Sequence, residues 1–165
     1  MTKPMTVSIP VAEKPSAPPA SVALGWRTAL PLVVLAIVAI LAIYWQTAES
    51  IVAIWDRSET FAHGYLIVPL SAALIWMRRK ELACIAPSPD YLGLVLLAGL
   101  GLGWLVAAAG QVQIVQQYAM VAMIPSAVVA VAGRRVAKAL TFPLGFLLLG
   151  VPIGEALIPP LMEWT

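Results

Sequence analysis

Four polar residues of the types that do chemistry lie close together in the sequence: Asp56, Ser58, Glu59 and His63. A histidine beside carboxylates could bind zinc, or could act as a general base that a carboxylate orients. Their spacing matches no specific ligand motif, and the alternative is a solvated polar turn at a membrane surface. We therefore predict no metal site and no catalytic residue here. His63, with its neighbour Gly64, stays a candidate for substrate contact or for a structural turn.

The single cysteine, Cys84, follows three consecutive basic residues, Arg78, Arg79 and Lys80. A catalytic thiolate needs a positive environment and also a base. The chain's one histidine, His63, precedes the apolar segment that separates it from Cys84. We therefore interpret Cys84 as an incidental thiol.

Glu155 is the third candidate, because it lies near the end of an apolar run, after Gly154 and before the pair Pro159 and Pro160. An ionisable residue at membrane depth is a functional candidate by default. The alternative is an interfacial carboxylate that reaches water. Both interpretations remain open.

Established cofactor and nucleotide motifs are missing from the sequence. It contains no phosphate-binding G-x-x-x-x-G-K-[ST] loop, no G-x-S-x-G nucleophile elbow and no C-x-x-C pair. We predict no cofactor and no nucleic-acid partner, and we interpret the basic clusters as signals of membrane topology.

The composition indicates a membrane protein. Of 165 residues, 61% are hydrophobic and only 11% are charged, whereas soluble domains have about one quarter charged residues. The mean hydropathy is +0.92. A water-soluble fold of this length cannot bury so much apolar surface, so the lipid bilayer is the expected partner.

The apolar segments predict an all-α fold, a polytopic transmembrane helical bundle with about five spans. The expected spans are residues 29–47, 61–77, 91–110, 115–132 and 140–154. Residues 48–60 are too polar to cross a bilayer and predict a short interfacial helix. Residues 1–25 are rich in proline and predict a disordered cytoplasmic tail. The transmembrane domain is therefore expected over residues 26–165.

The third expected span contains a GxxxG pair, Gly99 and Gly103. Such a pair lets two helices approach closely, although glycine is also generally common in membrane helices. The sequence favours neither explanation.

The basic residues orient these spans. In the five-span arrangement, nine of them fall on one side and only Arg57 on the other. The nine are Lys3, Lys14, Arg27, Arg78, Arg79, Lys80, Arg134, Arg135 and Lys138. Because basic residues accumulate in cytoplasmic loops, we expect a multi-pass protein whose N-terminus is cytoplasmic.

Two stretches resemble a known family. FAHGYLIVPLSAALIWMRR contains a phenylalanine, a His-Gly pair and a proline before a helix that ends in basic residues. TFPLGFLLLGVPIGEALIPPLMEWT is similar to a later segment of the same family. Together they resemble the exosortases, most closely exosortase A members, over residues 55–165. The matching positions are Phe61, His63, Gly64, Pro69, Arg78, Arg79, Phe142, Pro143, Phe146, Pro152, Glu155, Pro159, Pro160 and Leu161.

The resemblance implies a bacterial inner-membrane protein related to cysteine-type transpeptidases or peptidases. Such enzymes are expected to process proteins that carry a C-terminal PEP-CTERM sorting signal, in connection with exopolysaccharide production. The family's proposed catalytic Cys, Arg and His lie in later segments, and no residue here matches them. We therefore expect the N-terminal portion of such an enzyme, truncated before its catalytic segment.

Two other functions remain as alternatives. The first is a non-enzymatic membrane scaffold or assembly protein. The second is a small transporter, since proline-broken helices and Glu155 suit one, although the sequence shows no inverted repeat.

Overall fold

A computed structural model describes residues 25–59 and 61–152, and all the regular structure in these ranges is helical. The helices are α1 (Trp26–Ile43), α2 (Trp45–Arg57), α3 (Gly64–Met77), α4 (Arg79–Ala83), α5 (Tyr91–Ala109), α6 (Gln113–Ala132), α7 (Arg134–Ala139), α8 (Thr141–Leu147) and the 3-10 helix η1 (Leu148–Gly150). Residues 1–24 of the predicted tail, and Glu155, lie outside the described residues.

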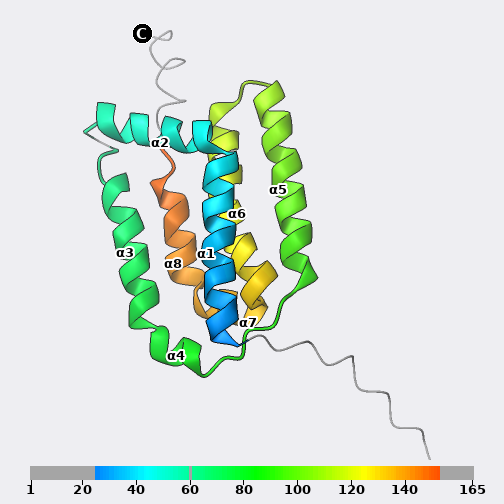
Figure 1. The fold of residues 1–165 in the computed structure, drawn as a ribbon. Helices are drawn as coiled ribbons and strands as arrows, with labels where there is room; N and C mark the ends of the chain where they lie inside the picture. The colour runs from blue at the N-terminus through cyan, green and yellow to red at the C-terminus, as the bar shows by residue number, and fades with distance from the viewer. Residues whose placement is uncertain (1–24, 60, 153–165) are drawn as a thin grey trace, which may run out of the picture.

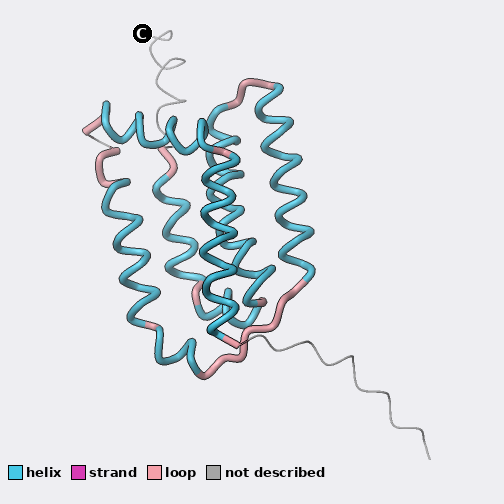
Figure 2. The backbone as a smooth tube through the Cα atoms, in the orientation of Figure 1, coloured by secondary structure: helices cyan, strands magenta, loops and turns pink. Residues whose placement is uncertain are grey.

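Some helices run along the length of the bundle, and others lie at its two ends. Helices α1, α3, α5, α6 and α8 run between the two ends, and α2 lies across one end (Figure 1). Helices α4 and α7 lie at the opposite end, and the connecting loops gather at the two ends (Figure 2). Helix α6 is central, because it contacts α1, α2, α5, α7 and α8.

This architecture confirms the predicted all-α membrane bundle. Helices α1, α5 and α6 are long and apolar enough to cross a membrane. Helix α3, with 14 residues, and the apolar stretch Thr141–Gly150 are shorter. All five predicted segments contain a helix, but two of those helices fall short of the usual spanning length of about 20 residues.

The interfacial helix is present, although its predicted boundaries were wrong. It begins at Trp45, and the first span ends at Ile43, because the backbone leaves the helical conformation at Tyr44. Helix α2 buries Ile51 and Ile54 against the bundle. Because its apolar face packs on the bundle while its polar face remains outside, the amphipathic α2 lies across the end of the bundle.

Two apolar clusters make the core. Ile40, Ile51, Met120, Met123 and Ala127 form the cluster on the α2 side. The other cluster joins α4, α6, α7 and α8; its buried members are Leu82, Val128, Ala132, Val136, Leu140 and Leu144. Because α6 contributes to both clusters, it connects the two ends of the bundle.

The tightest helix contact uses a glycine outside the GxxxG pair. A Cβ built on Gly93 would lie 2.1 Å from the backbone nitrogen of Ala130, so only glycine lets α5 approach α6 there. Nothing described lies within 4 Å of a Cβ built on Gly99 or Gly103. The GxxxG pair therefore makes no helix contact within the described residues.

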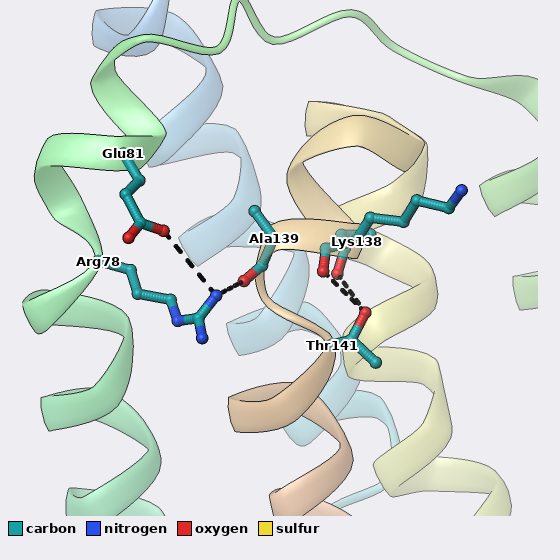
Figure 3. Close-up of polar contacts among 6 residues, drawn as sticks. Arg78, Glu81, Lys138, Ala139 and Thr141 are labelled. Atoms are coloured by element: carbon teal, nitrogen blue, oxygen red, sulfur yellow. Dashed lines mark hydrogen bonds and ion pairs between the residues drawn. The ribbon is translucent and has the colours of Figure 1, made fainter.

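The basic residues gather at the end formed by α4 and α7 (Figure 1). Those at this end are Arg27, Arg78, Arg79, Lys80, Arg134, Arg135 and Lys138. The Arg78 guanidinium donates to the Ala139 carbonyl at 2.8 Å and lies 3.9 Å from the Glu81 carboxylate (Figure 3). Arg78 thereby joins the end of α3 to the last residue of α7.

Candidate functional site at the α2 end

Trp55 links three elements at the α2 end of the bundle. Its indole N–H donates to the carbonyl of Gly150 in η1, and the two atoms are 2.9 Å apart. Its ring meets the Tyr65 ring of α3 edge to face, with centroids 5.2 Å apart and an interplanar angle of 66°. One side chain thus fixes α2 against both short apolar helices.

Gly64, of the His-Gly pair, makes this contact possible. A Cβ built on Gly64 would lie 2.2 Å from Cε2 of Trp55. The first turn of α3 is therefore in contact with the indole through its backbone. The structure assigns Gly64 a packing role, because any larger residue would displace Trp55 or α3.

Asp56 is engaged with α3. The Tyr65 hydroxyl donates to Oδ1 of Asp56 at 2.6 Å. Ser58 ends α2, and its carbonyl accepts from the Phe61 N–H at 3.0 Å. These contacts describe a hydrogen-bonded turn between α2 and α3. Within the described ranges, no three His, Cys, Asp or Glu residues come together as a possible metal site.

His63 lies at the N-cap of α3, at one end of an open groove. The side chain is exposed, and its ring centroid lies 6.5 Å from that of Phe61. The groove has a volume of about 370 Å³ and lies between α3 and the end of α8 and η1. Its other lining residues are apolar: Leu66, Ile67, Leu70, Phe146 and Leu149. His63 is therefore the polar residue of the groove's described lining, at the α2 end of the bundle.

A layer of hydrogen-bonded polar side chains beneath α2 was not predicted. The Trp104 indole donates to the Thr47 hydroxyl, and the Gln117 amide donates to the Ser50 hydroxyl, each at 3.0 Å. Gln117 is only 2% exposed. These bonds tie α2 to α5 and α6. The sequence offered one signal, the polar run QVQIVQQ at residues 111–117, of which residues 113–117 lie within α6.

Cys84 is far from His63. It is exposed at the C-cap of α4, and its thiol contacts the Lys80 carbonyl at 3.5 Å. Helix α3 separates the two ends, and its 14 residues correspond to about 21 Å. The structure therefore does not bring Cys84 and His63 together, and neither is positioned to act on the other.

The fold and this site define a multi-pass helical membrane protein with an interfacial helix fixed over two short apolar helices. A family model described as transmembrane exosortase (Exosortase_EpsH) matches residues 55–165, more than half of the chain. The chain therefore belongs to the transmembrane exosortase family, as the resemblance predicted. No curated protein and no solved structure matches it.

Proposed function

We propose that this protein takes part in processing proteins that carry a PEP-CTERM sorting signal, in the bacterial inner membrane and in connection with exopolysaccharide production. Membership of the exosortase family supports this function. The observation that carries it is the placement of the His63–Gly64 motif, which the Trp55 indole holds at one end of the bundle.

The described bundle would supply the outer-face scaffold of the processing site. Every described basic residue except Arg57 lies at the end opposite α2, which favours a cytoplasmic α4–α7 end and an outer α2 end. His63 and its groove would then face the side from which a translocated substrate approaches. Glu155 remains a proposed contributor, without a described position.

The resemblance to the family implies that a thiolate attacks a peptide carbonyl and that a positive side chain stabilises the developing negative charge. Cys84 is a poor candidate for this thiolate, because it lies at the end opposite His63. We therefore expect Cys84→Ser to leave processing unchanged.

The test is a reporter protein with a PEP-CTERM signal, expressed in the native host. Deletion of the whole chromosomal gene that contains this sequence should leave the reporter unprocessed, and reintroduction of that gene, either wild-type or with Cys84→Ser, should restore processing. Processing that continues in the deletion strain would contradict the proposal. Loss of processing in Cys84→Ser cells at normal protein abundance would instead identify Cys84 as the nucleophile.

A further inference from the structure

A second groove lies at the basic end, between the start of α1 and the end of α3. It has a volume of about 330 Å³ and also borders α4. Its apolar lining includes Trp26, Leu30, Ala72, Ile75 and Trp76, and among the described residues Arg79 is the only charged one in the lining. The groove is thus mostly apolar, with one cation in its described lining.

The position of this groove on the bundle is suited to binding a lipid. Leu30 is 60% exposed and Trp76 is 67% exposed on the outer surface of the bundle, so the groove opens towards the acyl chains of a bilayer. Trp26 is held in place, because its indole donates to the Ile85 carbonyl at 2.9 Å. Tryptophans at helix ends mark the headgroup level of a membrane. The apolar part of the groove therefore lies at the depth of an acyl chain, just below the headgroups.

The two neighbouring arginines have different contacts at this point. Arg78 turns towards Ala139 and Glu81 and joins two helices. Arg79 lies over the Trp76 ring, with Cζ 4.7 Å from the centroid, and donates one hydrogen bond to the Trp76 carbonyl at 3.0 Å. A guanidinium has five N–H donors, so Arg79 keeps donors for a phosphate at the end of the groove.

We propose that this groove binds an anionic phospholipid, with an acyl chain against Leu30 and Ile75 and the headgroup phosphate at Arg79. Charge complementarity selects the lipid class, because Lys80 adds a second exposed cation next to Arg79. Basic pockets between transmembrane helices are known to favour anionic headgroups. The proposal does not depend on the processing function proposed above.

The experiment is native mass spectrometry of the full chain, purified in detergent and titrated with phosphatidylglycerol or with phosphatidylcholine of identical acyl chains. The wild type should retain more phosphatidylglycerol. Arg79→Gln should weaken phosphatidylglycerol binding roughly fivefold, as expected for the loss of one basic side chain at an anionic surface, and should leave phosphatidylcholine binding unchanged. Ala72→Trp, which fills the groove, should weaken the binding of both lipids.

Arg135→Gln is the matched control, because Arg135 is exposed on α7 at the same end but does not line the groove. It should bind both lipids as the wild type does. The proposal fails if the wild type retains the two lipids equally, or if Arg135→Gln loses as much phosphatidylglycerol as Arg79→Gln. It also fails if inorganic phosphate displaces the lipid, since the site would then recognise the anion alone.

Discussion

The Trp55 indole donates its N–H to the carbonyl of Gly150, 95 residues away in the sequence. This bond closes the α2 end of the bundle, because it joins the interfacial helix to the last described helical turn. We expect Trp55→Phe to keep most of the ring packing but to leave the carbonyl without its donor. The free energy of unfolding in detergent should fall by about 1 kcal/mol.

Trp45→Phe is the control for this substitution, because Trp45 is 64% exposed on the same helix. It should leave the free energy of unfolding unchanged. Equal destabilisation by the two substitutions would show that the Gly150 bond contributes nothing specific.

Gly64→Ala should destabilise the protein because the added methyl group would overlap the Trp55 indole. Overpacking of this kind costs about 1–3 kcal/mol. Gly99→Ala should be neutral, since nothing described lies within 4 Å of that position. In a Trp55→Ala background the cost of Gly64→Ala should largely disappear, and a double-mutant cycle measures this coupling. Additive effects would refute the contact.

Asp90 gives stability a defined pH dependence at the basic end. A hydrogen bond from the Leu92 N–H and the ion pair with Arg134 lower the pKa of Asp90 below its ordinary value of 3.8. Since the folded pKa is the lower one, the carboxylate stabilises the fold fully above pH 3.8 and loses this effect as the pH falls through the folded pKa.

Thermal unfolding of the wild type and of Asp90→Asn checks this pH dependence. The wild type should be more stable near neutral pH, and the difference should vanish in strong acid. Glu81→Gln is the control, because its carboxylate lies 3.9 Å from Arg78 and is 69% exposed. A difference between wild type and Asp90→Asn that stays constant with pH would rule out the ionised carboxylate as its source.

His63→Ala should reduce reporter processing only in part, because His63 lies at the N-cap of α3 and borders a groove without a metal-like cluster among the described residues. Replacing a positioning residue lowers the reaction rate far less than replacing a group that forms a covalent bond to the substrate. Processing is measured in cells alongside membrane abundance. Complete loss of processing at normal abundance would make His63 catalytic, whereas lost abundance would indicate a structural turn.

Topology is tested with Cys84, which is exposed at the basic end. We expect an impermeant maleimide to label it only after the cells are permeabilised, because basic loops stay in the cytoplasm. Ser58→Cys in a Cys84→Ser background places a thiol at the α2 end and should be labelled in intact cells. The reverse pattern would invert the orientation.

Much of the fold follows from local sequence. The continuous apolar runs, and the amphipathic segment after the first of them, were sufficient to predict the bundle and its interfacial helix. The start of the interfacial helix was predicted wrongly, because a tryptophan such as Trp45 is as typical of the interfacial end of a span as of the first turn of α2. The sequence also could not distinguish the roles of the consecutive basic residues, although Arg78 and Arg79 make different contacts in the structure.

The site was harder to predict because its contacts are distant in sequence. Gln117 and Ser50 are 67 residues apart, and no local pattern pairs them. Gly64 was a candidate from its motif, but the reason for glycine became clear only when Trp55 was placed against it.

The shortness of α3 has a consequence for the bilayer around it. Its 14 residues span about 21 Å, whereas the hydrocarbon core of a typical bilayer is about 30 Å thick. A short span is accommodated by local thinning of the membrane and by flanking cations that reach towards the headgroups. We therefore expect water and headgroups to come deeper beside α3 than beside the longer helices α1, α5 and α6. A substrate that is anchored by a transmembrane helix and approaches His63 would therefore have more of that helix in contact with water.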